Sequence, residues 1–158
     1  MNETRREAVL VQRLDEAGVG YEILEHERSE TAAAEAAALD LPAHDVAKTV
    51  VVATDQGNVR VVVPASERVD MRKLRDLLGG SKEVRLLTEN DLAHDYAAFE
   101  LGAVPPVGGP EDAVVVDTRF RPEQRVVLEA GAHDRSVRIA LADLVAVAHA
   151  STADVCAD

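Results

Sequence analysis

The stretch DVAKTVVVATDQGNVRVVVPA, residues 45–65, contains two valine-rich segments separated by a turn sequence. Residues 50–53 are apolar at every position, which is typical of a strand that is covered on both faces. Residues 59–63 are almost as apolar, and the intervening residues 55–58, DQGN, favour a tight turn. The stretch therefore predicts a β-hairpin of two largely buried strands.

One lysine, Lys48, lies inside the first of these segments. A solvated strand end or sheet edge would accommodate it, because the stem of a lysine packs against apolar surface while its ammonium group reaches water. A lysine held in a cleft is the alternative, and there the charge is costly to bury and is commonly used for function. The pattern of the segment leaves both interpretations open.

The rest of the chain mixes helical and extended patterns without strict βαβ alternation. A first helix is predicted from a possible Thr4/Glu7 capping box, through an apolar stripe of Leu10, Val11, Leu14 and Ala17, to its end at Gly18. Thr31 can cap a helix through Leu39, and Asp70 can cap a helix with Met71, Leu74, Leu77 and Leu78 inward and Gly79-Gly80 at its end. Further helices are predicted after Thr88 and near 141–149. Strands are predicted at 21–26, 83–87, 113–117, 124–129 and 136–140. We therefore expect an α+β domain around a mixed or mainly antiparallel sheet.

The bulk composition indicates one domain spanning residues 1–158, which is long enough for a core without disulfides or metals. Only 3% of the residues are aromatic although 47% are hydrophobic, so the core must be built from Val, Leu, Ala and Ile. The net charge of −12 argues against a general nucleic-acid coat. No signal peptide and no apolar run of about 20 residues is visible, so a soluble, cytoplasmic protein without membrane association is expected.

Several kinds of chemistry have no motif in the sequence. The phosphate-binding GxxxxGK[ST] loop, the HExxH zinc motif and the GxSxG nucleophile motif are missing, and the histidines are scattered without metal-ligand spacing. The single cysteine, Cys156, is interpreted as a tail residue rather than a nucleophile. Covalent catalysis is therefore unsupported, which leaves a site that positions water and stabilises charge. We expect neither a cofactor nor a metal.

Two glycine-bearing segments could form such a site. FELGAVPPVGGP, residues 99–110, combines glycines with a stiffening Pro-Pro pair, and a rigid loop of this kind can direct backbone N–H groups toward an oxyanion. EAGAHDRSVRI, residues 129–139, places Gly131 and His133 between two predicted strands. Purely structural turns would explain both segments equally well.

A basic cluster interrupts the otherwise acidic composition. Its members are Arg68, Arg72, Lys73 and Arg75, followed by Lys82 and Arg85. A solvated helix face with an Arg72/Asp76 pair at i,i+4 spacing is one interpretation. A docking patch for a polyanion is the other.

Taken in order, AKTVVV, GAVPPVG and AGAHDRSVRI, with TAAAEAAAL upstream and VVPASERVDMRKL between, resemble the YbaK/prolyl-tRNA-synthetase-associated domain family. Members of this family are editing domains that hydrolyse amino acids wrongly attached to tRNA. The resemblance covers about residues 8–148. It implies a curved mixed or mainly antiparallel central sheet with flanking helices, and a free-standing deacylase, because no synthetase catalytic domain accompanies it.

The resemblance also implies roles for individual residues. Lys48 matches the family's essential lysine, at the mouth of the cleft, and is expected to act in catalysis. The loop residues that match the family's contacts to the aminoacyl group are Gly102 and Ala103. Gly131 and His133 match the late segment that lines the pocket, where His133 would orient water. Thr31 matches a threonine near the pocket, although helix capping explains it equally well.

Two departures from the family pattern concern the substrate. Ala97-Ala98 replaces a frequent Thr-Gly, and Pro106-Val107-Gly108 replaces a frequent Pro-Phe-Gly. The loop sequence FELGAVPP resembles that of free-standing editors for alanine, serine or threonine more than that of cysteine-specific members.

The expected partner is a mischarged tRNA. It would dock on Arg68, Arg72, Lys73 and Arg75, or be delivered by a synthetase or an elongation factor. The alternatives are a non-catalytic module that binds a nucleotide or amino acid, and an interaction protein that accompanies a synthetase.

Overall fold

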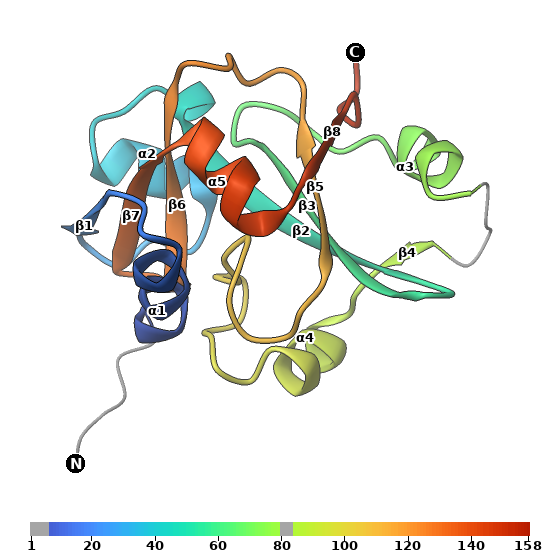
Figure 1. The fold of residues 1–158 in the computed structure, drawn as a ribbon, viewed down its shortest axis with the longest axis horizontal. Helices are drawn as coiled ribbons and strands as arrows, with labels where there is room; N and C mark the ends of the chain where they lie inside the picture. Colours follow the sequence, from blue (N-terminus) through green and yellow to red (C-terminus); the bar gives the residue numbers. More distant parts are fainter. Residues whose placement is uncertain (1–6, 80–83) are drawn as a thin grey trace.

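The computed structural model of the protein describes residues 7–79 and 84–158. Within them, a mixed sheet of eight strands runs through the molecule and helices pack against it (Figure 1). The strand order is β1-β7-β6-β2-β3-β5-β8, and β4 pairs with β2 outside this path. In chain order the elements are α1 (Ala8–Ala17), β1 (Tyr21–Glu25), α2 (Ala32–Ala38), η1 (Ala43–Asp45), β2 (Val46–Thr54), β3 (Gly57–Pro64), α3 (Met71–Leu77), β4 (Arg85–Leu86), α4 (Glu89–Asp95), β5 (Ala113–Asp117), β6 (Arg125–Ala132), β7 (Arg135–Ala140), α5 (Leu141–Ala148) and β8 (Ser151–Ala153).

The central strand β2 has a gap in its pairing on one side. It pairs antiparallel with β3, from Ala47 to Thr54. On its other side it pairs parallel with β6 only at Val46 and Ala47, and antiparallel with β4 only at Val52 and Ala53. No described strand pairs with residues 48–51 on that side. The sheet therefore forks after Ala47, where β6 diverges from β2.

Apolar layers cover opposite faces of the sheet near this fork. Val126 and Leu128 of β6 pack with α1 and α5 in the larger core, whereas Val127 between them packs with α2. This alternation is the period of two expected for a strand with both faces buried. Val46 of β2 lies in the same layer as Val127. Positions 48 and 129, two residues further along each strand, are therefore directed toward the α2 side of the sheet.

The predicted hairpin and the predicted fold class are confirmed. β2 and β3 form the hairpin, and antiparallel pairs predominate slightly in a mixed sheet flanked by helices. Three of the predicted helix caps are also present, whereas the N-cap residue of α1 is Glu7 and not the predicted Thr4. Thr31 Oγ1 accepts a hydrogen bond from Ala34 N–H, Asp70 caps α3, and Thr88 opens α4 with a capping box.

Other details of the sequence interpretation are wrong. The extended segment predicted at 83–87 is reduced to β4, because only two residues of β2 remain to pair with it. Leu77, predicted to face the core, is 46% exposed, because the short α3 packs through its other apolar residues. The predicted features at Thr4 and Gly80 and the basic residue Lys82 lie outside the described residues. No helix in the described ranges is long and apolar enough to cross a membrane.

The C-terminal segment is not a loose tail. β8 adds to the sheet beside β5, and Val155 and Cys156 are fully buried. Asp117 fixes this segment by accepting a hydrogen bond from Val155 N–H at 2.9 Å. Burial raises the pKa of the Cys156 thiol to about 12. The thiol is therefore protonated at neutral pH and packs as a small apolar group.

Candidate active site

A pocket of about 190 Å³ lies at the fork between β2 and β6. It is lined from three directions: by the start of α2, by β2 with the end of β6, and by the loop after α4. The lining residues are Glu30, Thr31, Ala32, Ala47, Lys48, Thr49, Val50, Gly102, Val104 and Glu129. The pocket brings together three of the predicted site residues, Lys48, Gly102 and Thr31. Ala103, Gly131 and His133 do not line it.

Lys48 is the cation of this pocket. It is half-buried in β2, and its Nζ has no hydrogen bond or ion pair with any described residue. A lysine that serves only to support a structure is usually paired when it is partly buried. The Lys48 ammonium group is thus available to a ligand, which favours the cleft interpretation over the solvated sheet edge.

The loop from Leu101 to Pro106 supplies backbone donors. Gly102 has φ +84°, a conformation that favours glycine, and neither its N–H nor that of Val104 forms a hydrogen bond within the described residues. The N–H of Ala103 between them donates to Glu100 O at 3.0 Å, and Ala103 is fully buried. Gly102 and Val104 are therefore the candidate oxyanion donors, and Ala103 belongs to the support of the loop.

In the ester hydrolysis that the family resemblance implies, replacing Gly102 by valine is expected to lower the rate about tenfold or more, because a β-branched residue is strained at this positive φ and would displace the loop amides. A Cβ at this position would also lie 3.6 Å from the His133 ring. Initial rates of the purified variant measure the effect. Gly79→Val, another glycine at positive φ but outside the pocket, is the matched control. Equal rates in the two variants would mean that residue 102 is only part of a turn.

Arg60 holds the loop from behind. It is fully buried in β3 and donates to the carbonyl groups of Pro105 (2.8 Å), Gly108 (2.7 Å) and Pro110 (2.8 Å). Its Nε donates to Asp112 at 2.9 Å. Four of the five N–H groups of the guanidinium group are thereby used, three of them to fix the loop at residues 105–110 and one to bind Asp112. The sequence interpretation missed this residue, which lies in an apolar strand pattern.

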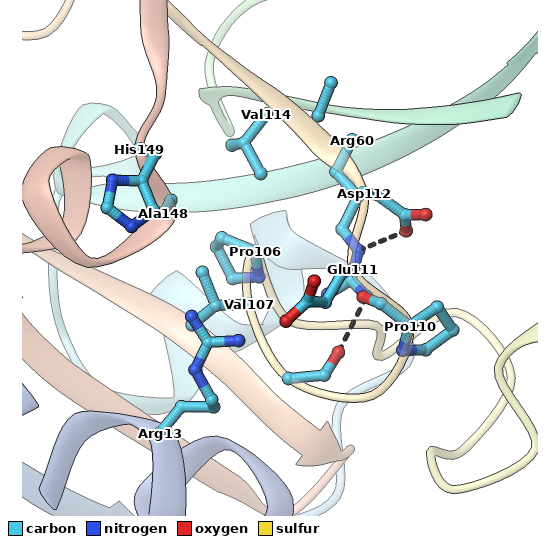
Figure 2. Close-up of a pocket in the computed structure, with 12 residues that line it drawn as sticks. Arg13, Arg60, Pro106, Val107, Pro110, Glu111, Asp112, Val114, Ala148 and His149 are labelled. Atoms are coloured by element: carbon cyan, nitrogen blue, oxygen red, sulfur yellow. Dashed lines mark hydrogen bonds and ion pairs between the residues drawn. The ribbon is translucent and has the colours of Figure 1, made fainter. Parts of the chain in front are cut away.

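A larger cavity, of about 380 Å³, lies on the far side of this loop (Figure 2). Figure 2 shows Arg13 and Glu111 pointing into it, with His149 at the end of α5 nearby. Its buried cation, Arg60, already donates four hydrogen bonds, to three loop carbonyls and to Asp112. The smaller pocket at the fork, with an unpaired lysine and two unpaired amides, is better suited to chemistry.

His133 lies directly behind the loop. Only 3% of the residue is exposed, and its Nε2 is 2.7 Å from Leu101 O. Its backbone N–H donates to the carboxylate of Glu100 at 3.1 Å, and Glu100 N–H donates to Gly131 O at 2.8 Å. Gly131 and His133 thus tie the β6–β7 turn to the loop that lines the pocket.

Arg28 completes this tie from the segment that precedes α2. Its guanidinium group reaches both carboxylate oxygens of Glu100, at 2.6 and 3.2 Å. Arg28 also lowers the pKa of Glu100, so this carboxylate is charged at neutral pH. Three chain segments that are distant in sequence therefore meet at Glu100.

Two buried carboxyl groups were not predicted. Glu129 lines the pocket, and burial together with the charges of neighbouring glutamates raises its pKa to about 8. Glu35, fully buried in α2, accepts a hydrogen bond from Ser136 Oγ, and burial raises its pKa to about 7. Glu35 follows the apolar run AAA and Glu129 follows VVL, and a single acid after an apolar run is the sequence signal that could have identified each as a buried carboxyl group. Within the described residues no His, Cys, Asp and Glu group could hold a metal ion.

Thr31 has both of the roles that the sequence left open. Its Oγ1 caps α2 by accepting from Ala34 N–H at 3.0 Å, and the residue also lines the pocket. Because capping fixes the first turn of α2, it also fixes the wall of the pocket formed by Ala32.

The basic cluster is only partly available. Lys73 Nζ is bound to the carboxylates of Asp154 and Asp158 and to Cys156 O, and Arg85 pairs with Asp91. Arg68, Arg72 and Arg75 are exposed and form no ion pair among residues 7–79 and 84–158. Figure 1 shows α3, which carries Arg72 and Arg75, separated from α2 along the long axis of the molecule.

Residues 26–147 match the family model described as the aminoacyl-tRNA editing domain. The match spans more than half of the chain and includes β2, the loop after α4 and the end of β6. The chain therefore belongs to the aminoacyl-tRNA editing domain family, which confirms the resemblance that the sequence motifs indicated.

Solved structures share the fold. A protein provisionally assigned as a trans-editing enzyme for prolyl-tRNA synthetase superposes with a TM-score of 0.88 at 22% identity, covering 99% of this chain and 100% of that chain. A hypothetical protein superposes with a TM-score of 0.84 at 26% identity, covering 94% and 99%. A provisionally assigned signal-transduction protein from Marinobacter aquaeolei contains the fold within a longer chain, with a TM-score of 0.71, 20% identity and coverage of 99% and 31%. Curated protein sequences give no match.

Proposed function

We propose that this protein is a trans-editing deacylase that hydrolyses the ester bond between a small amino acid and the terminal ribose of tRNA. The observation that carries the proposal is the unpaired ammonium group of Lys48 in a pocket that two unpaired loop amides also line. These donors suit the negative charge that develops on an ester carbonyl oxygen under attack by water. Membership of the editing family supports the choice of ester.

In the proposed reaction, water adds to the carbonyl carbon and gives a tetrahedral oxyanion. Lys48 Nζ and the N–H groups of Gly102 and Val104 stabilise this oxyanion, and one such donor is typically worth about 3–4 kcal/mol. The carbon–oxygen bond to the ribose then breaks, the proton that the attacking water has lost ends on the ribose oxygen, and the free amino acid and tRNA are released. The ester is already activated, so the chain need not supply a nucleophilic side chain.

We assign His133 a positioning role in this reaction. Its Nε2 is engaged by Leu101 O and the ring is almost completely buried, so it holds the residue next to Gly102 in place. The earlier expectation that His133 orients the attacking water would require the ring to leave this contact. Lys48 is thus the side chain that we place at the reacting atoms.

The pocket favours a small amino acid. Its volume of about 190 Å³ is below the roughly 300–1,000 Å³ of typical ligand pockets. Ala32, Ala47, Val50 and Val104 form apolar walls. A larger side chain would be excluded by clash, whereas a missing methylene group would be discriminated by only about 1–3 kcal/mol.

The direct test is a deacylation assay of the purified protein against a panel of mischarged tRNAs. Rapid release of alanine, serine or threonine, with bulkier esters left intact, is the expected result. A protein that binds aminoacyl-adenosine analogues but hydrolyses no ester would instead be a binding module of this fold. A protein that does neither, yet is retained by a synthetase, would be an interaction protein.

For tRNA docking, we propose that the exposed arginines Arg68, Arg72 and Arg75 contact the phosphate backbone, with Lys73 held back by its carboxylate partners. Changing both Arg72 and Arg75 to Glu is expected to weaken binding of full-length tRNA about tenfold or more at low salt, because phosphate contacts carry salt-dependent affinity. Hydrolysis of a minimal aminoacyl-adenosine ester should stay unchanged. The loss should shrink as salt rises, which a filter-binding series can measure. If the double variant binds tRNA normally, a synthetase or elongation factor that delivers the tRNA becomes the better proposal.

A further inference from the structure

We propose that Glu129 binds the α-ammonium group of the aminoacyl moiety, so that the pocket recognises the free amine of its substrate. The inference rests on the proposed deacylase function and adds to it a second recognition point. Lys48 would face the ester carbonyl, and Glu129 would face the amine that is bonded to the neighbouring carbon.

The strand register places the two residues at matching positions. β2 and β6 pair in parallel at Val46 with Val127 and at Ala47 with Leu128. The next step in this register is Lys48 with Glu129, which is where the strands part and the pocket opens. Residues in register on adjacent strands direct their side chains to the same face of a sheet. A cation and a carboxyl group thus stand on the two arms of the fork.

The carboxyl group of Glu129 has a close polar neighbour, the His133 ring, but no hydrogen bond in the part of the chain that the structure describes. Its side chain is 12% exposed, and neither oxygen forms a hydrogen bond within the described residues. Oε2 lies 3.0 Å from His133 Nδ1, but off the line that a hydrogen bond requires, so both buried atoms remain unsatisfied. A buried unsatisfied carboxyl is costly, and in a pocket a cationic ligand group would satisfy it.

The surroundings of Glu129 favour a cation. The charges of Glu35, Glu100 and Glu30 all act on it, and the basic groups around it are the His133 ring at 3.0 Å and Lys48, which lines the same pocket. Its pKa of about 8 is close to the value of roughly 7.7–8 for an α-amino group. One proton can therefore be shared between the acid and the amine with little net charge to desolvate.

Amine recognition would have a functional consequence. Esters whose amine is blocked, as in N-acylated or peptidyl-tRNA, would lose this contact and would place an acyl group against the walls around Glu129. The pocket would thus spare chains that are being elongated and act on newly charged tRNA.

The test compares alanyl-tRNA with lactyl-tRNA, in which a hydroxyl group replaces the amine and the rest of the ester is identical. The wild-type protein should hydrolyse the alanyl ester roughly 10- to 100-fold faster in kcat/KM, the effect of one hydrogen bond to a charged group. Glu129→Gln should remove most of this preference by slowing the alanyl ester and leaving the lactyl ester nearly unchanged. Glu123→Gln, an exposed acid outside the pocket, should keep the wild-type ratio.

Other results would overturn the inference. Equal wild-type rates on the two esters would show that the amine is not read, and this comparison needs no variant. An equal loss on both esters in Glu129→Gln, with an unchanged melting temperature, would make Glu129 a support for His133 and the loop.

Failure of the deacylase proposal is detected separately. If the wild-type protein hydrolyses neither ester, the affinities for 3′-alanylamido- and 3′-lactylamido-adenosine are compared by calorimetry. A preference for the amine that Glu129→Gln removes would sustain the inference without catalysis. Equal affinity, or no binding of either analogue, would overturn it.

Discussion

Replacing Lys48 by alanine is expected to lower the rate of deacylation roughly 10²–10³-fold, the usual loss when one donor to a developing oxyanion is removed. The melting temperature should stay within a few degrees of wild type, because Lys48 Nζ has no protein partner among the described residues. Under the proposed function, the Lys48 charge contacts only the substrate, so its loss would change the transition state and not the core.

Lys48→Met sharpens this experiment, because it keeps most of the aliphatic stem and removes only the charge. Single-turnover kinetics on alanyl-tRNA, run beside thermal melts of both variants, give the answer. Normal turnover in Lys48→Met would remove Lys48 from the mechanism. Unfolding of both variants would return it to a structural role.

Replacing Arg60 by methionine is expected to cost about 3–5 kcal/mol of unfolding free energy, as when one partner of a buried ion pair is removed. The change removes the hydrogen-bond donor of the Pro105, Gly108 and Pro110 carbonyls. Asp112 keeps its hydrogen bond from Tyr96 Oη at 2.6 Å. Activity should fall with stability, because the loop that carries Gly102 is no longer held.

Denaturant unfolding of Arg60→Met measures the first effect, and Arg125→Met is its matched control. Arg125 is an exposed arginine with a single surface ion pair to Glu22, for which at most about 1 kcal/mol is expected. A loss as small in Arg60→Met as in Arg125→Met would show that the loop is stable without its buried anchor. Full activity in Arg60→Met would separate the anchor from the site.

The sequence predicted those structural features that depend on residues close to one another in the chain. The hairpin follows from two valine runs around DQGN, and Thr31, Asp70 and Thr88 cap their helices as predicted. β8 could not be predicted in this way, because three residues form a strand only where β5 offers an edge.

The candidate site was predicted only in part, for a related reason. Lys48 and Gly102 stand out by residue type, but Glu129 becomes meaningful only through its register with Lys48 across the fork. In the sequence, Arg60 is a single polar position in an apolar strand, because the loop carbonyl that it binds lies 45 residues later in the chain. Contacts over such separations leave no periodic trace in a single sequence.

At the fork in the sheet, the residues whose strand pairing holds β2 in place are different from several of the residues that line the pocket. Val50, Val104 and Glu129 meet the pocket where no ladder joins β2 to β6, so their side chains can change without breaking a strand pairing there. The pairings that close the fork, at Val46 and Ala47 on one side and Val52 and Ala53 on the other, stay intact. If the pocket hydrolyses the proposed ester, substituting these few side chains would change its ester selectivity while the strand pairings that close the fork are kept.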